Sequence, residues 1–146
     1  MFAANEIELE KLFHHSGREL SLFITSEWHL TARALLECQD ESSSTTTRIL
    51  SFPPELPQWR STARVTLLGD SAPLMSPNAG LGAVTTIKSA VTLSQAIEKH
   101  GISDTAMAEH EGKMREHTWL AITISEAEGK VMVNQLPIAK CKVVDW

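Results

Sequence analysis

The sequence lacks the surplus of positive charge that a nucleic-acid-binding protein needs. Its 13 Lys and Arg residues are outnumbered by 18 Asp and Glu residues, which gives a net charge of -5. Because phosphate backbones select for basic surfaces, we expect no nucleic-acid partner. The sequence also lacks any apolar run near the ~20 residues that a membrane-spanning helix needs, so we expect no membrane partner either.

Targeting signals and cysteine pairs are equally scarce. The first residues carry Glu6, Glu8 and Glu10, where a secretory signal peptide needs positive charge followed by an apolar stretch. Cys38 and Cys141 lie far apart and form no CxxC unit, which favours packed thiols over a disulfide or a metal site. These absences predict a cytoplasmic protein.

The hydrophobic pattern predicts an α+β fold with a few strands. Residues 20–24, 48–52 and 64–68 form short apolar runs that are typical of buried strands. Ser26 can act as the N-cap of a helix that runs through Glu37. The stretch 40–47, DESSSTTT, is polar and is interpreted as a mobile connection.

Two long helices are predicted in the second half. The first runs from Gly82 to about Lys99, and its apolar positions share one side at helical spacing: Ala83, Val84, Ile87, Ala90, Val91, Ser94 and Ile97. His100-Gly101 is a good stop signal. Ser103 can cap the second helix, which has Met107, Met114 and Ala121 on its apolar side. The pattern fades after Gly129.

The loop before the first long helix combines two kinds of binding group. Asp70 follows a predicted buried strand, at the sheet edge where ligands of α/β folds commonly bind, and its carboxylate can accept hydrogen bonds from hydroxyls. Further on, Gly80 and Gly82 in the segment PNAGLG lie at a helix N-terminus, where unpaired amides favour an anion or a carbonyl oxygen. Glycine also lets a ring or a phosphate approach the backbone closely.

This segment resembles the flavin-binding motif of the aromatic-hydroxylase-like FAD-dependent monooxygenases, which include many fungal pathway enzymes. Their pattern is Gly-Asp, a small pair, His, then Pro-x-x-Gly-x-Gly and a helix with Asp-Ala, matched here by Gly69, Asp70, Pro77, Gly80, Gly82 and Ala90. The resemblance implies that Asp70 binds the ribityl hydroxyls of FAD, and that backbone near Gly80, Gly82 and Ala83 lies beside the isoalloxazine and pyrophosphate. Looser similarity extends from about Leu20 to Lys130, and His110-Glu111-x-x-Met114-Arg115 matches the family's Tyr-Glu-x-x-Met-Arg.

The resemblance also implies a partial flavoprotein monooxygenase fold. Residues 1–63 would be a remnant of the substrate and sheet region, 64–130 the flavin-binding strand-loop-helix with the following helix, and 131–146 a C-terminal tail. The N-terminal dinucleotide-binding half is missing, because the sole Gly-x-Gly, at 80–82, follows a proline loop and has Thr85 in the third glycine's place. In the complete enzyme, NADPH or NADH would reduce FAD, and O2 would hydroxylate or epoxidise a small organic substrate, with secondary metabolism as the suggested setting. We expect this fragment to be inactive alone.

Three departures from the motif leave a second hypothesis open. Pro73, Val84 and Ser89 stand where the family has His, Asn and Asp. Pro73 and Ser89 together remove an imidazole and a carboxylate from close to the flavin, and no catalytic residue can be named. The alternative is a non-catalytic remnant that acts as a small interaction protein with a partner subunit.

Two other motifs fail on inspection. His110-Glu111 begins like HExxH, but Met114 occupies the fifth position, so we predict no zinc site. Ser71 follows a predicted strand and turn, but its surroundings do not form the Gly-x-Ser-x-Gly of a hydrolase elbow.

Overall fold

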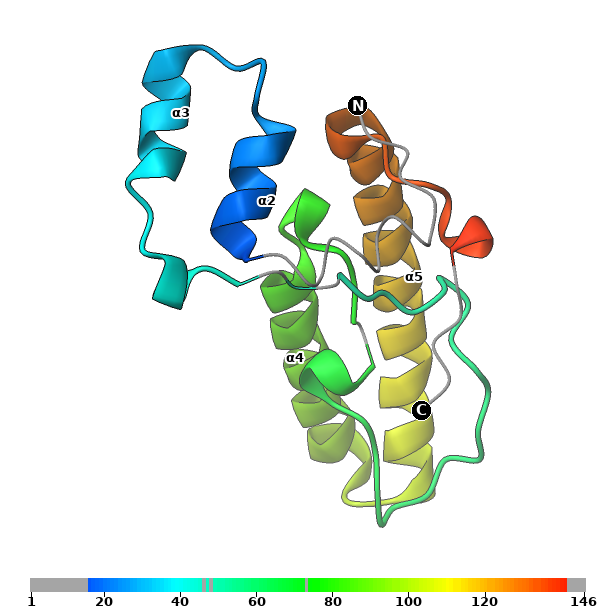
Figure 1. Ribbon diagram of the computed structural model, residues 1–146. Coiled ribbons are helices and arrows are strands. Elements are labelled where there is room, and N and C mark those ends of the chain that lie inside the picture. Colours follow the sequence, from blue (N-terminus) through cyan, green and yellow to red (C-terminus); the bar gives the residue numbers. More distant parts are fainter. Residues whose placement is uncertain (1–15, 46, 48, 73, 142–146) are drawn as a thin grey trace. The chain divides into compact units, whose positions relative to one another are not determined.

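A computed structural model describes residues 16–45, 47, 49–72 and 74–141. The predictions made for Pro73, for residues 1–15 of the expected first segment and for residues 142–146 of the expected tail lie outside the described residues. The chain divides into two compact units, Met1–Arg48 and Ile49–Trp146. Figure 1 shows their helices, and each unit is described by itself.

The first unit contains α2 (Gly17–Ile24) and α3 (Leu30–Glu37). The predicted strand at 20–24 is wrong, because these residues form the last part of α2. A capping box starts this helix: the Ser16 hydroxyl accepts the Glu19 N–H at 3.2 Å, and Glu19 accepts the Ser16 N–H at 3.3 Å. One helix side explains the apolar residues equally well, since Leu20, Phe23 and Ile24 have the spacing i, i+3, i+4. In a run of only five residues this helical spacing is hard to tell from a strand.

The helix predicted from Ser26 starts later, at Leu30, because His29 provides the cap. Its Nδ1 accepts the Thr31 N–H at 3.3 Å. The polar stretch that follows contains a short 3-10 turn, η1 (Glu41–Ser43), capped by Asp40. Hydrogen bonds from Ser42 and Ser43 lower the pKa of Asp40.

The second unit is built on a hairpin of α4 (Gly82–His100) and α5 (Asp104–Val133), which confirms the two predicted long helices. Gly101 ends α4 with a φ of 63°, a left-handed conformation that favours glycine. The Ser103 hydroxyl then accepts the Ala106 N–H at 3.2 Å and starts α5, as predicted. The two helices lie side by side (Figure 1).

The interface between these helices is built from small and polar side chains of α4. Its buried residues are Thr85, Ser89, Thr92 and Ala96. They face a longer buried side of α5 that includes the three residues predicted there, Met107, Met114 and Ala121. Ile97 of the apolar side predicted for α4 packs against the core, but other members point outward: Val84 is 47% exposed, Ile87 63% and Val91 47%.

The predicted α+β class is wrong, since the described part of the chain contains helices and no strand. Arg64 lies in a turn, an isolated bridge joins Thr62 and Val65, and residues 66–68 form no ladder within the part of the chain that the structure describes. Residues 49–52 are likewise unpaired as a strand, with Phe52 N–H donating to the Leu74 carbonyl at 2.9 Å. Polar groups of the 64–68 segment bond to side chains of α5 instead, as shown below.

The described part of this unit also contains three short 3-10 turns: η2 (Gly69–Ser71), η3 (Pro77–Ala79) and η4 (Ile138–Lys140). None of the helices in the described ranges combines the length and apolar character that crossing a bilayer requires. Nor do the described residues bring together three or more side chains suited to bind a metal ion.

Candidate functional site

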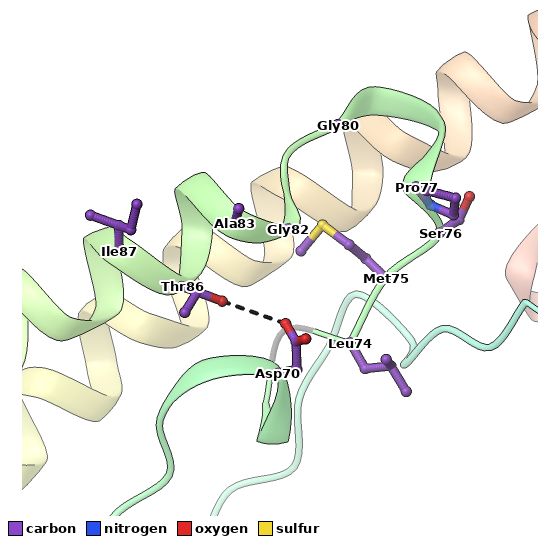
Figure 2. A pocket seen from close by; sticks show the side chains of 10 residues that line it. All are labelled: Asp70, Leu74, Met75, Ser76, Pro77, Gly80, Gly82, Ala83, Thr86 and Ile87. Carbon is purple, nitrogen blue, oxygen red and sulfur yellow. Dashed lines mark hydrogen bonds between the residues drawn. The ribbon is translucent and has the colours of Figure 1, made fainter.

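A pocket of about 620 Å³ lies where η2, the following loop and the N-terminus of α4 meet (Figure 2). Five of the six predicted cofactor-binding residues line it: Asp70, Pro77, Gly80, Gly82 and Ala83. The sixth, Gly69, precedes Asp70 and is not part of the lining. The structure adds Leu74, Met75, Ser76, Thr86 and Ile87, which the sequence analysis missed. The positions of Thr86 and Ile87 follow from helical spacing, because they lie four residues after Gly82 and Ala83.

Asp70 is placed at the pocket by the turn η2. Gly69 begins this turn with a φ of 66°, which explains the glycine. The Asp70 side chain is exposed, and the Thr86 hydroxyl lies 3.5 Å from its Oδ1, at the long limit of a hydrogen bond (Figure 2). Its two carboxylate oxygens can therefore accept further hydrogen bonds from a ligand.

The glycine loop opposite Asp70 is anchored to α5 and to the segment that follows it. Ser125 Oγ donates to the buried Ser76 carbonyl at 2.6 Å, and Asn78 Nδ2 donates to Gln135 Oε1 at 2.7 Å. Gly80 has a φ of 64°, so its conformation favours glycine. Gly82 begins α4 with no such need. A Cβ at either position would meet nothing within 4 Å, so both leave open space beside the backbone.

The N-terminus of α4 carries backbone amides that no side chain caps. Leu81 is the N-cap residue and makes no side-chain cap bond within the part of the chain that the structure describes. Its carbonyl accepts both the N–H and the hydroxyl of Thr85, at 2.9 and 2.8 Å. The first-turn amides of this 19-residue helix and the positive end of its dipole therefore favour an anion or a carbonyl oxygen. Together with Asp70, they suit a ligand that has hydroxyls and an anionic part.

Behind the pocket, α5 binds the segment that leads to Asp70. Fully buried Glu111 accepts hydrogen bonds from Ser61 Oγ at 2.6 Å and Thr66 Oγ1 at 3.1 Å. Burial alone would raise the pKa of Glu111, but hydrogen bonds from Ser61, Trp59 and Thr66 and the charge of Arg115 outweigh it, so the pKa is lowered. The Arg115 guanidinium also stacks over the Trp59 ring, 4.0 Å from its centroid. Glu111 and Arg115 of the matched Glu-x-x-Met-Arg thus bind the segment that leads to Asp70.

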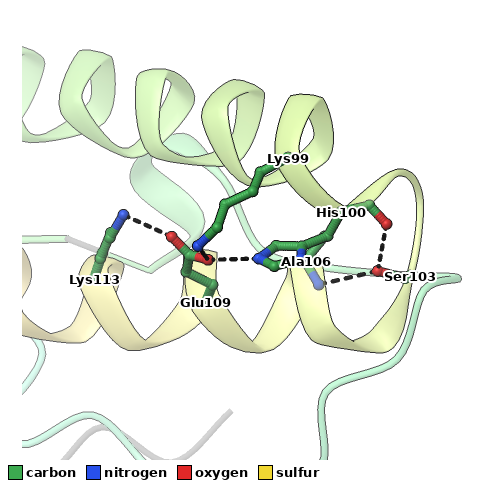
Figure 3. A network of polar contacts seen from close by, with 6 residues as sticks. All are labelled: Lys99, His100, Ser103, Ala106, Glu109 and Lys113. Carbon is green, nitrogen blue, oxygen red and sulfur yellow. Dashed lines mark hydrogen bonds and ion pairs between the residues drawn. The ribbon is translucent and has the colours of Figure 1, made fainter.

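A second charged cluster joins the C-terminal end of α4 to the N-terminal part of α5 (Figure 3). Glu109 Oε1 lies 2.9 Å from Lys113 Nζ, and Glu109 Oε2 lies 2.9 Å from His100 Nε2 and 3.1 Å from Lys99 Nζ. Hydrogen bonds from Lys113, His100 and Lys99 lower the pKa of Glu109 to about 2. None of these four residues lines the pocket. Because the cluster joins α4 to α5, it stabilises the hairpin.

Comparison with known proteins finds relatives that carry a flavin-dependent activity in their names. The dual O-methyltransferase/FAD-dependent monooxygenase of Cercospora beticola is 37% identical over 139 residues, which are 94% of this chain and 16% of the relative. The protein of the same name from Cercospora nicotianae is 36% identical over 139 residues, with the same coverage. That of Phaeosphaeria nodorum (strain SN15) is 38% identical over 113 residues, 76% of this chain and 12% of the relative. The chain is a relative of the FAD-dependent monooxygenases.

The predicted family relationship is therefore confirmed. The chain spans 16% or less of the length of the curated relatives that it matches. No protein-family model and no solved structure matches it.

Proposed function

We propose that this chain forms one wall of the FAD site of a FAD-dependent monooxygenase. The observation that supports the proposal is the shared pocket of Asp70 and the glycine-lined N-terminus of α4. The named activities of the relatives include both O-methyl transfer and FAD-dependent monooxygenation. The second suits this chain better, because the pocket residues are those of the flavin motif.

The pocket fits parts of FAD that differ in chemistry. The Asp70 carboxylate would accept hydrogen bonds from the ribityl hydroxyls, and these charge-assisted bonds are of the stronger class. The amides at Gly82 and Ala83 would bind an oxygen of the isoalloxazine or the pyrophosphate, and the open space at Gly80 and Gly82 gives such a group access to the backbone.

The chemistry of the reaction would come from the cofactor. Bound FAD would take electrons from NADPH or NADH and activate O2 for the hydroxylation or epoxidation of a small organic substrate. The chain's own part would be to bind and orient the cofactor. Leu74, Met75 and Ile87 on the pocket wall would help to exclude water.

We expect the isolated chain to bind FAD weakly and to turn over no substrate. Its sequence contains no dinucleotide-binding fingerprint, and its relatives are at least six times as long as the matched region. The ADP part of the cofactor therefore requires protein surface that these residues do not provide. We also propose that the chain acts in a secondary-metabolic pathway and in the cytoplasm.

Calorimetric titration with FAD tests the assignment. Asp70→Asn should weaken binding by about tenfold, because an amide replaces one charged acceptor. The matched control is Glu98→Gln, which removes one carboxylate from an exposed position of α4 outside the pocket. Equal affinity of the Asp70→Asn variant and the wild type would refute the role of Asp70, and submicromolar affinity of the wild-type chain would refute the expectation of an incomplete site.

A second candidate function is a non-catalytic interaction protein, which the outward apolar side of α4 favours. Val84, Ile87 and Val91 recur at helical spacing and are all exposed, whereas this helix buries polar residues. The partner that we propose is the remainder of a FAD-dependent monooxygenase on another polypeptide, since the relatives extend far beyond the matched region. Size-exclusion chromatography with a relative that lacks its own copy of the matched region should show a complex that Ile87→Ser weakens and Glu98→Gln leaves unchanged. Co-elution that is equal for all three proteins would refute the surface.

A further inference from the structure

His110 connects the two walls of the pocket from behind. This residue of α5 is fully buried. Its Nε2 lies 3.2 Å from the Leu67 carbonyl oxygen, and its Nδ1 lies 3.2 Å from the Thr92 hydroxyl. Leu67 precedes Asp70 by three residues, and Thr92 belongs to α4, whose first turns form the opposite wall.

The chemistry of these contacts assigns a donor and an acceptor to the ring. The Leu67 carbonyl can only accept, so Nε2 must carry a hydrogen and donate it. In the neutral tautomer with that hydrogen, Nδ1 accepts from the Thr92 hydroxyl, which has the Ser89 carbonyl 2.9 Å away as an alternative acceptor. The neighbouring Glu111 binds Thr66, so two consecutive residues of α5 hold two consecutive residues of the segment before Asp70.

We propose that His110 is a positioning residue, which sets where the Asp70 turn lies relative to α4 and thereby the shape of the FAD pocket. The role in FAD binding rests on the proposed function, whereas the role in ordering the turn does not. A side chain that only filled space at this position would need no polar atoms. The two ring nitrogens instead reach one group in each of the two segments that carry the walls, and without the imidazole the Leu67 carbonyl would lose its His110 partner.

Two substitutions separate positioning from packing. His110→Gln keeps an amide N–H for the Leu67 carbonyl and an oxygen that can accept from Thr92, whereas His110→Leu keeps similar volume without either. The matched control is Thr118→Val, which alters another fully buried residue of α5 that contacts neither wall through a hydrogen bond of its side chain. Thermal unfolding of all three variants shows which of them are folded before other measurements are compared.

Amide hydrogen exchange of the full chain measures the order of the turn without any flavin. The probes are the Leu68 and Ala72 amides, which bond to Ser71 Oγ and the Gly69 carbonyl, with amides in the middle of α5 as the internal reference. In His110→Leu, the two probes should exchange about three- to tenfold faster relative to that reference, as expected for one lost hydrogen bond. His110→Gln and Thr118→Val should match the wild type. Unchanged probes in His110→Leu, or equal acceleration in Thr118→Val, would overturn the proposal.

Titration with FAD then tests the connection to the site. We expect a three- to tenfold weaker affinity in His110→Leu and rescue by glutamine, in parallel with the exchange rates. If the probes accelerate but FAD affinity is the same in wild type and variant, the proposed link between turn and cofactor is refuted. If the wild type binds no FAD at all, the proposed function fails, and the exchange result still decides whether His110 orders the turn.

Discussion

Replacing Glu111 by glutamine should substantially destabilise the helical hairpin unit. The carboxylate is fully buried and accepts hydrogen bonds from Ser61, Thr66 and Trp59. Glutamine retains one acceptor oxygen, so at least one of these three donors loses its partner. Because a hydrogen bond to a charged group contributes about 1.5–3 kcal/mol, we expect the free energy of unfolding to fall by about 2–3 kcal/mol. That is a large part of the roughly 5–15 kcal/mol typical of a whole domain.

Urea denaturation followed by circular dichroism measures this change. With an m-value of about 2 kcal/mol/M, the midpoint for Glu111→Gln should fall by roughly 1 M. Glu116→Gln is the control, because it removes a carboxylate from an exposed position of the same helix and should change stability by less than about 0.5 kcal/mol. If Glu111→Gln unfolds within that same margin of the wild type, the hydrogen-bond network does not hold the 57–66 segment as we argue.

The pH dependence provides an independent test of the same network. The pKa of Glu111 in the folded chain lies below its ordinary value of 4.5. A depressed carboxyl pKa contributes stability that is present above the unfolded-state pKa and is lost as pH falls through the folded-state pKa. The stability difference between wild type and Glu111→Gln should therefore be constant from pH 7 to about 5 and narrow below about 4. A difference that stays constant down to pH 2 would show that the charge of Glu111 is irrelevant.

Three further predictions concern other parts of the hairpin unit. Ser103→Ala removes the N-cap of α5 and should cost about 1 kcal/mol in thermal unfolding; no change would show that the cap is dispensable. Gly129→Ala places a Cβ 2.5 Å from Gln135 Oε1 and closer still to the Asn78 amide, so these two side-chain ends should shift and lose their hydrogen bond; chemical denaturation should show about 1 kcal/mol less stabilisation than Gly112→Ala, where a Cβ meets nothing within 4 Å, and equal effects would contradict the observed packing. Glu109→Gln should lower the unfolding midpoint at pH 7 but lose this effect between about pH 4.5 and 2, because the pKa of Glu109 is about 2, and a pH-independent effect would argue against the ion cluster.

The sequence predicted the long helices well because their ends have local signals. The capping oxygen of Ser103 and the left-handed Gly101 determine where one helix stops and the next begins, and both are visible in the chain. The capping box of Ser16 and Glu19 is an equally local signal, and it would have corrected the strand predicted at 20–24. That error arose because an apolar run of five residues fits a buried strand as well as one side of a helix.

The segment 64–68 shows a different limit of sequence reasoning. Its composition suits a strand, but a strand also needs a neighbouring chain to complete its hydrogen bonds, and the sequence of one segment does not contain that information. Here the side chains of His110 and Glu111 bind Leu67 and Thr66 instead. The pocket was easier to predict than the fold, because the glycines and Asp70 lie within one short stretch of chain. Leu74 and Met75 joined the lining through the path of the loop, for which the sequence offered no signal.

The outward apolar side of α4 connects the two candidate functions. Helical spacing correctly indicated that Ile87 and its apolar neighbours share a side, but it could not indicate whether this chain or another surface covers them. Ala83 and Ile87 belong both to that side and to the pocket wall, so a surface that covered the apolar residues would also adjoin the pocket (Figure 2). Association and cofactor binding would then be thermodynamically linked, each changing the affinity of the other by the same factor. The proposed interaction surface and the proposed wall of a flavin site can therefore belong to the same helix.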